Sequence, residues 1–383
     1  MTASPFASFF GGGFECSSHR RRDGVRLDLL AATGHDRHVA EDYRLLARHG
    51  LRTARDGLRW HLIETAPGRY DWSSFLPMLH AARATGLQVA WDLCHYGYPD
   101  GARIWEASFV ERFARFAAAA ARLVRDETDA VPIYCPVNEI SYWAWAGGTV
   151  GKIAPGVRRR GSELKRQLVR CAIAAIEAIR AVDPRARFLH AEPLIHIRAA
   201  STRSDHLTLA RRQTEAQFEA WDLLTGRLMP ELGGRPDYLD LCGLNYYPDN
   251  QWLPGGRFIP MGHHLYRPMR ELLAAVHARY GRPLYIAETG AEGSARAAWL
   301  HYVAGEVGAA IEAGLPVLGV CLYPVLAYPG WEDGRLCETG LFSAADGDGQ
   351  RIVAADVAAE LARQQGLFGE AGFTALQRAG AAA

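Results

Sequence analysis

Two glutamates, each at the end of a short apolar run, are the residues of this 383-residue chain best placed for chemistry. Glu139 follows Asn138 at the end of the run 133–139, and Glu288 ends the run 283–288. Such runs predict buried strands, each of which delivers one glutamate to its carboxyl end. If the two carboxyl groups face each other, one can protonate the leaving oxygen of a glycoside while the other attacks the anomeric carbon or activates water.

Further polar side chains end runs of the same kind, and they are Arg55, His95, Asn138, Glu192, Asn245 and Tyr247. A cation and several neutral hydrogen-bonding groups beside two glutamates suit the cleavage of a glycosidic bond. Alternatively, each glutamate is a surface residue at the start of a loop. For one glutamate alone that would be the better interpretation, but two glutamates at equivalent places make it the weaker one.

The elements that must position these residues alternate along the chain. Apolar runs predict eight strands, at 9–15, 51–60, 87–95, 133–139, 187–192, 238–247, 283–290 and 315–323. Helical spacing predicts helices after them, at 36–49, 73–85, 106–125, 162–182, 212–225, 268–280, 295–313 and 354–365. This alternation is typical of an α/β protein with a single (β/α)8 TIM barrel. We expect residues 1–368 to form this glycosidase domain and residues 369–383 to be a frayed tail.

The chain is longer than the roughly 250 residues of a typical barrel of this kind. We expect the extra length in the loops 143–161, 199–204, 249–264 and 327–337. These loops follow predicted strands four, five, six and eight, so they elaborate the catalytic face, where active sites of such barrels lie. Four tryptophans in or near them, Trp143, Trp145, Trp252 and Trp331, either stack on a sugar or pack the loops against the barrel.

The composition argues against several other classes of protein. The formal net charge is +1, so we expect neither a nucleic acid nor a membrane surface as partner. The partner that we expect from the residues above is a small carbohydrate or glycoside. The seven cysteines show no CxxC spacing, which indicates neither a zinc site nor a disulfide framework. We predict a cytoplasmic protein without a signal peptide or membrane span. No cofactor and no metal is predicted, and the oligomeric state stays open.

At the two glutamates the chain resembles glycoside hydrolase family 1, the β-glucosidase and β-galactosidase family of retaining enzymes. Asn138-Glu139 resembles the family's Asn-Glu pair on the fourth strand, and this implies that Glu139 is the acid/base. Glu288-Thr289-Gly290 resembles its Glu-Asn-Gly on the seventh strand, with Thr289 in place of the Asn, and this implies that Glu288 is the nucleophile. The resemblance implies hydrolysis of O-glycosyl bonds in a β-linked glucoside or galactoside.

Three further segments are similar to the same family and imply sugar-binding roles. Arg55 matches its second-strand arginine beside the nucleophile, where a cation lowers a carboxyl pKa. His95 matches a histidine that holds a sugar hydroxyl, and Asn138 should bond the 2-hydroxyl. Alternation along the sixth strand places Asn245 and Tyr247 on one face, which favours Tyr247 as the hydroxyl that touches the nucleophile.

The resemblance ends where the family recognises its sugar. In the eighth-strand segment Trp331 is retained, but Gly330 stands where the family has a glutamate, and Glu332 or Asp333 could substitute for it. His19 or Arg20 lies near the place of the family's first-strand Gln. The sugar, the aglycone, any phosphate on the substrate, and the choice between hydrolysis and transfer therefore stay open.

Two other functions are alternatives. The first is a metal-dependent barrel hydrolase, with ligands among His190, Glu192, His196, His263 and His264, but these residues lack an assembled spacing. The second is a non-catalytic carbohydrate-binding barrel, which the departures from the family motifs would allow.

Overall fold

A closed barrel of eight parallel strands forms the centre of the computed structural model, which describes residues 4–369. The strands are β1 (Phe10–Gly13), β2 (Thr53–Gly57), β5 (Gln88–Asp92), β6 (Ile133–Cys135), β7 (Arg187–Pro193), β9 (Leu241–Asn245), β12 (Leu284–Thr289) and β13 (Val317–Leu322). Each pairs in parallel with its neighbours, and β1 closes the ring by pairing with both β2 and β13. The predicted (β/α)8 fold is confirmed. Of the tail expected at 369–383, all but Gly369 lies outside the described residues.

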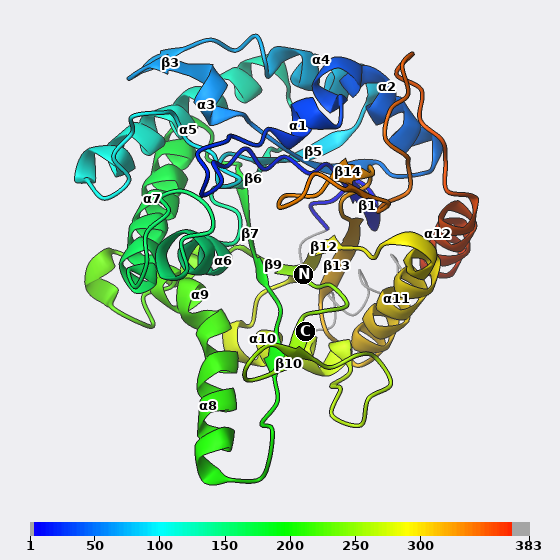
Figure 1. The fold of residues 1–383 in the computed structure, drawn as a ribbon. Helices are drawn as coiled ribbons and strands as arrows, with labels where there is room; N and C mark the ends of the chain where they lie inside the picture. The colour runs from blue at the N-terminus through cyan, green and yellow to red at the C-terminus, as the bar shows by residue number, and fades with distance from the viewer. Residues whose placement is uncertain (1–3, 370–383) are drawn as a thin grey trace.

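Helices surround the barrel, as Figure 1 shows. The main ones are α2 (His35–Arg48), α4 (Leu76–Thr85), α5 (Ala107–Glu127), α7 (Gly161–Val182), α9 (Glu219–Leu224), α10 (Met269–Tyr280), α11 (Arg296–Glu312) and α12 (Ala355–Phe368). In α5, Phe109, Phe113, Phe116 and Ala120 recur every three or four residues and are all buried. This spacing gives the helix one apolar stripe that packs on the strands.

Two cores result from this arrangement. The larger lies between the strands and the helices, and the smaller fills the barrel with side chains such as Ile133, Leu189, Leu241 and Tyr285. Small residues on β1 make room inside: a Cβ on Gly13 would lie 2.2 Å from the ring of Tyr323. The barrel interior is therefore packed, and a ligand can approach only at its ends.

One predicted helix differs from the structure. The segment 212–225 is divided into α8 (Ser204–Glu215), a 3-10 turn (Ala216–Phe218) and α9. Helix α8 begins earlier than predicted and projects from the body at the bottom of Figure 1. Its only buried residue is Ala210, so it lacks the apolar stripe from which the other helices could be predicted.

The long loops carry structure of their own. Strands β8 (His196–Ile197), β10 (Gln251–Leu253) and β11 (Arg257–Phe258) form a small sheet below the barrel in Figure 1, and β14 (Tyr328–Pro329) pairs with β15 (Leu336–Cys337). A second pair of short strands, β3 (Glu64–Ala66) and β4 (Arg69–Tyr70), follows β2 and the short helix α3 (Trp60–Ile63). After β6 the chain forms α6 (Ile140–Trp143) and a π-helix (Ala144–Thr149).

A buried charged cluster stands behind β2. His35 lies between Asp42, at 2.7 Å, and Asp56, at 2.8 Å, and Arg351 bonds the same Asp42. Burial opposes a charge on His35, but the two aspartates prevail and raise its pKa to about 9. The cluster joins the segment around Arg351 to β2, the strand that carries Arg55.

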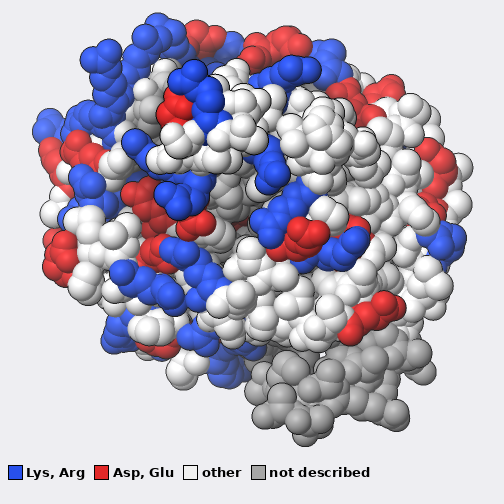
Figure 2. All heavy atoms as spheres, turned by 90° about the horizontal axis from the view of Figure 1, so that it is seen from below, with Lys and Arg blue, Asp and Glu red and all other residues white. Residues whose placement is uncertain are grey.

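The surface agrees with the small net charge. On the face shown in Figure 2, basic and acidic side chains are interspersed among uncharged ones. Among residues 4–369, no helix is both long enough and apolar enough to cross a membrane.

Candidate active site

Arg55 links the polar strand ends into one network. The side chain is 1% exposed. Its guanidinium donates to both oxygens of Asp92, at 2.9 and 2.7 Å, to Oδ1 of Asn138 at 2.6 Å, and to Oε1 of Glu288 at 2.6 Å. Asp92 is on β5, which pairs with β2, whereas Asn138 follows β6 and Glu288 is on β12, so Arg55 joins groups from several sides of the barrel. A planar guanidinium with five donors suits this role, which lysine could not fill.

Glu288 receives donors on both carboxylate oxygens. Arg55 bonds Oε1, and the hydroxyl of Tyr247 donates to Oε2 at 2.8 Å. Tyr246, on the other face of the strand end, instead places its hydroxyl 2.6 Å from that of Tyr266. Arg55 and Tyr247 thus hold the Glu288 carboxyl group in place from two sides. Burial and the charge of Glu288 hold the pKa of Tyr247 well above its ordinary range, so Tyr247 stays a donor.

Glu139 has a different environment. Asn245 donates to Oε1 at 2.9 Å, and the hydroxyl of Tyr96 donates to Oε2. No cation bonds this carboxyl group within residues 4–369. Burial, and then the charge of Glu288, raises its pKa to about 8. At neutral pH Glu139 is therefore largely protonated.

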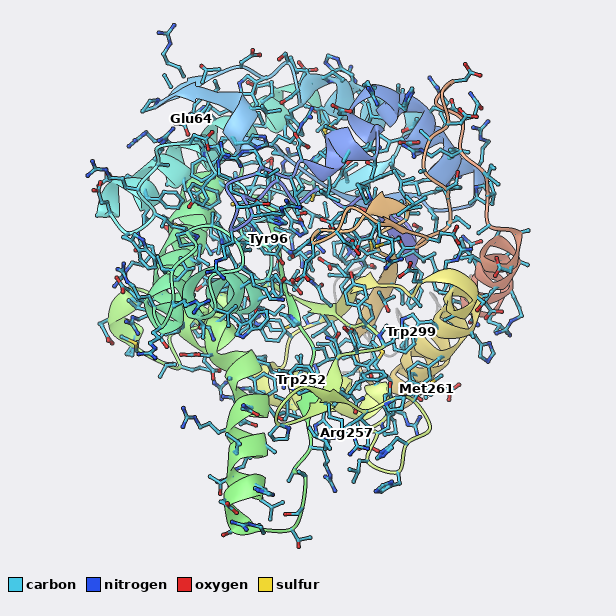
Figure 3. All side chains as sticks on the ribbon, in the orientation of Figure 1. Glu64, Tyr96, Trp252, Arg257, Met261 and Trp299 are labelled. Carbon is cyan, nitrogen blue, oxygen red and sulfur yellow. The ribbon has the colours of Figure 1, made fainter. Side chains whose placement is uncertain are left out.

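The backbone at Glu139 is strained. Its φ of 41° lies in the left-handed region, which is uncommon for a residue other than glycine. Its N–H donates to the carbonyl of Ala191 at 2.9 Å, and α6 begins at the next residue. Tyr96, which bonds the Glu139 side chain, also has a positive φ, of 65°. Strain of this kind clusters at functional sites, where surrounding contacts maintain it. Figure 3 shows Tyr96 inside the ring of helices.

Asn138 and His95 extend the network along one wall. Asn138 Nδ2 lies 2.8 Å from His95 Nε2 and 3.1 Å from the Tyr96 hydroxyl. His95 Nδ1 lies 3.1 Å from Asp92, so the histidine ring is held from both sides. Burial raises the pKa of Asp92, but Arg55 and His95 outweigh it, and the result is below the ordinary value. Asp92 thus stays ionised and holds both Arg55 and His95.

The structure does not bring every predicted residue into this network. The side chain of Glu332 is 81% exposed and pairs with Lys152 at 3.0 Å, because its loop directs it into solvent. Trp331 is half-buried, and its ring lies 4.6 Å from that of His19 and 5.9 Å from that of Tyr96.

The other tryptophans have varied surroundings. Trp143 is buried and donates to the carbonyl of Ala154 at 2.8 Å, so it packs its loop. Trp145 is exposed. Trp252 is part of β10, where it pairs with Phe258 of β11, and Figure 3 labels it near the bottom of the barrel.

None of the residues considered as metal ligands belongs to a group of three ligand atoms within the described chain. His190 bonds the carbonyl of Tyr238, and Glu192 accepts from the N–H of Ser141 at the start of α6. Within the described chain, the one group of suitable ligand atoms is Cys16, Asp92 and His95. It fits a metal poorly, because the Arg55 cation occupies both oxygens of Asp92 and burial raises the thiol pKa of Cys16 well above its usual range.

Asp92, Tyr96 and Glu15 belong to the site but were not predicted. Asp92 could have been noticed as a charged residue inside an apolar run, three positions before His95. Tyr96 contacts Glu139 only because its backbone turns into the left-handed region, which nothing in its residue type indicates. Glu15 follows β1 and matches no motif, and its buried carboxylate lies 3.9 Å from His95.

Comparison with solved structures places the fold. A family 1 β-glucosidase from Thermotoga maritima has a TM-score of 0.76 at 17% identity, over 94% of this chain and 97% of that one. The AHE enzyme from Alicyclobacillus herbarius has a TM-score of 0.75 at 18% identity, over 95% of this chain and 99% of that one. A rice β-glucosidase, Os3BGlu6, was solved as a mutant in a covalent complex with Glc. It has a TM-score of 0.74 at 18% identity, over 94% of this chain and 98% of that one.

No protein-family model and no curated protein matches the sequence. The similarity is therefore one of three-dimensional structure, over nearly the whole chain. This chain has the fold of the family 1 β-glucosidases.

Proposed function

We propose that the protein is a retaining β-glycoside hydrolase whose nucleophile is Glu288 and whose acid/base is Glu139. The observation that carries the proposal is the end of β9. Asn245 and Tyr247, two residues apart, donate to Glu139 and to Glu288 respectively. Two glutamates far apart in sequence therefore meet across one strand end. We expect their carboxyl groups to be about 5–5.5 Å apart, as double displacement requires.

The two environments suit different tasks. Glu288 accepts hydrogen bonds from the Arg55 guanidinium and the Tyr247 hydroxyl, which hold it in place as a nucleophile needs. Glu139 is protonated at neutral pH, because its pKa is about 8, and can act as the acid. Environments that separate two carboxyl groups in this way assign the acid and the base.

The reaction then has two steps. Glu288 attacks the anomeric carbon while Glu139 gives its proton to the departing oxygen, so that the glycosidic bond breaks and a glycosyl ester forms. The ester removes the charge of Glu288, so the pKa of Glu139 falls, and its carboxylate can accept a proton from water. The resulting hydroxide attacks the anomeric carbon, and Glu288 leaves as a carboxylate.

Other residues of the network would bind the sugar. We propose that Asn138 exchanges one of its contacts, with His95 or Tyr96, for the 2-hydroxyl, an interaction that strengthens in the transition state. Arg55 bonds both Glu288 and Asn138 and so fixes their relative positions. The half-buried Trp331 ring is a candidate wall for the glycone. We expect a neutral, glucose-like or galactose-like glycone and a cytoplasmic location. We also propose that residues up to 368 form one domain.

A panel of 4-nitrophenyl β-glycosides that differ in the sugar tests the proposal. The wild type should cleave at least one member, and the first sugar released should be the β-anomer in proton NMR. Glu288→Gln should abolish turnover without unfolding the protein. Glu306→Gln, which changes a buried glutamate that bonds Arg270 on the outer helices, is the matched control and should stay active.

Release of the α-anomer first would contradict retention. Full activity of Glu288→Gln would end the nucleophile assignment. Sugar binding without any turnover would favour the alternative of a non-catalytic carbohydrate-binding barrel.

A further inference from the structure

Glu15 is a third carboxylate at the site, and the reaction described above does not use it. It follows β1 and is 7% exposed. One oxygen, Oε1, accepts from the N–H of Ser17 at 3.0 Å and lies 3.9 Å from His95 Nε2. Neither oxygen pairs with an arginine or lysine within residues 4–369, and Oε2 accepts no hydrogen bond from the protein there.

A purely structural role explains Glu15 poorly. A buried carboxylate is costly unless cations or several donors compensate it. Burial and the nearby charge of Glu288 both disfavour its ionised form, and only His95 and Ser17 offset them. A ligand that donates hydrogen bonds would supply the missing compensation, as hydroxyl groups of a sugar can.

Polar atoms without partners surround the same part of the site. The Tyr323 hydroxyl, His19 Nδ1 and Trp331 Nε1 are buried, and none has a hydrogen-bond partner within the described protein. The Tyr323 ring is stacked at 6.3 Å from His95, and the His19 ring lies 4.6 Å from Trp331. Burial, and then His95, lowers the pKa of His19 to about 3, so this ring is neutral. Buried polar groups of this kind are unfavourable unless they are bonded, and a bound ligand can bond them.

The order of groups along the wall indicates which part of a sugar reaches Glu15. Glu288 must lie at the anomeric carbon, and Asn138 is proposed at the 2-hydroxyl. Asn138 Nδ2 lies 2.8 Å from His95 Nε2, and the same His95 nitrogen lies 3.9 Å from Glu15 Oε1. A sugar bound with its 2-hydroxyl at Asn138 would then present its next hydroxyls, those on C3 and C4, to His95 and Glu15.

We infer that Glu15 accepts hydrogen bonds from the 3- and 4-hydroxyls of the glycone and determines which sugar is bound, an inference that rests on the proposed glycosidase function. A carboxylate accepts bonds from two neighbouring hydroxyls readily, because its two oxygens lie side by side. Glu15 also adds a third carboxyl group to a wall in which the Arg55 cation already pairs with both Glu288 and Asp92, so no cation there is free to bind an anionic glycone. A glycone that carries a carboxylate or a phosphate is therefore rejected, and a neutral one is accepted.

Binding in a variant that cannot turn over tests this inference. Calorimetry would measure the affinity of Glu288→Gln for 4-nitrophenyl β-glucoside and for its 3-deoxy, 4-deoxy and 6-deoxy analogues. The affinity of the Glu15→Gln/Glu288→Gln double variant for the same four sugars would then be compared. We expect the second substitution to weaken the parent sugar about 10- to 100-fold, the range for hydrogen bonds to a charged group. The 6-deoxy analogue should weaken as much as the parent, and the 3-deoxy and 4-deoxy analogues, each of which retains one of the two bonds to Glu15, should weaken by clearly less.

Equal weakening of all four sugars would overturn the inference, because it would indicate a general structural effect of Glu15. Unchanged binding, or no binding of any of the four sugars, would overturn it as well. Glu306→Gln in the Glu288→Gln background is the control for the loss of a buried carboxylate, and it should bind like its parent. The proposed hydrolase function is tested separately, by turnover in the wild type, because this binding experiment requires no turnover.

Discussion

Neutralising Glu288 should change the acidity of Glu139. The pKa of Glu139 is raised to about 8, first by burial and then by the charge of Glu288. In Glu288→Gln the second cause disappears, whereas the first remains. The titration of Glu139 in this variant therefore measures how strongly the two carboxyl groups interact.

The expected size follows from their separation. Two charges about 5.5 Å apart, with an effective dielectric constant of about 20, interact by about 3 kcal/mol. At 1.36 kcal/mol for each pKa unit, this is about two units. The pKa of Glu139 should accordingly fall to about 6 in Glu288→Gln.

Difference infrared spectroscopy of the carboxyl C=O band gives the titration directly, with Glu139→Gln variants as references that remove the signal of Glu139. In the wild type, kcat/KM should also decline as pH rises through about 8, because the acid must begin protonated. If Glu139 titrates within about half a unit of its wild-type pKa in Glu288→Gln, the two groups do not share one cleft.

Three further changes have definite expected outcomes. Tyr247→Phe removes the hydroxyl that donates to Glu288, so kcat/KM should fall about 10- to 100-fold while the thermal melting curve stays nearly unchanged. An unaltered rate would show that this hydroxyl has no part in catalysis. The charge on His35 stabilises the fold fully below pH 6.5, and this contribution is lost as pH rises towards 9. In denaturant unfolding, the free energy of unfolding of the wild type should therefore fall by about 3 kcal/mol relative to that of His35→Gln across this range. A difference that does not depend on pH would contradict this. Glu332→Gln should change kcat/KM less than about twofold, since an exposed ion pair contributes about 0–1 kcal/mol, and a large loss would bring Glu332 into the site.

Most of the fold could be predicted from the sequence because two periodicities determine it. Buried parallel strands give continuous apolar runs, and the helices that cover them give stripes like that of α5. Helix ends were also predictable where a glycine supplies the left-handed C-cap, as Gly86 does after α4 with φ 66°. Helix α8 could not be placed, because it projects from the body and has little apolar periodicity.

The site was predictable as far as it lies on strand ends. Alternation predicted that Asn245 and Tyr247 share one face and favoured Tyr247 as the contact of Glu288, but it did not predict that Asn245 donates to Glu139. Contacts that depend on loop conformation were not predictable. Tyr96 turns through a positive φ to contact Glu139, and the loop that ends in Trp331 directs Glu332 outwards. Glu15 escaped notice because its role depends on how β1 lies against His95, and its residue type alone says nothing of this.

Covalent trapping tests the central claim most directly. A 2-deoxy-2-fluoro β-glycoside with a good leaving group forms a glycosyl ester on the nucleophile of a retaining enzyme, and the fluorine slows the hydrolysis of that ester. Mass spectrometry of the digested protein should find the fluorosugar on the peptide that contains Glu288, and the label should be absent from Glu288→Gln. Failure to label a wild type that cleaves the matching aryl glycoside, or a label on any other residue, would contradict the assignment of Glu288 and Glu139 as the pair that divides the reaction.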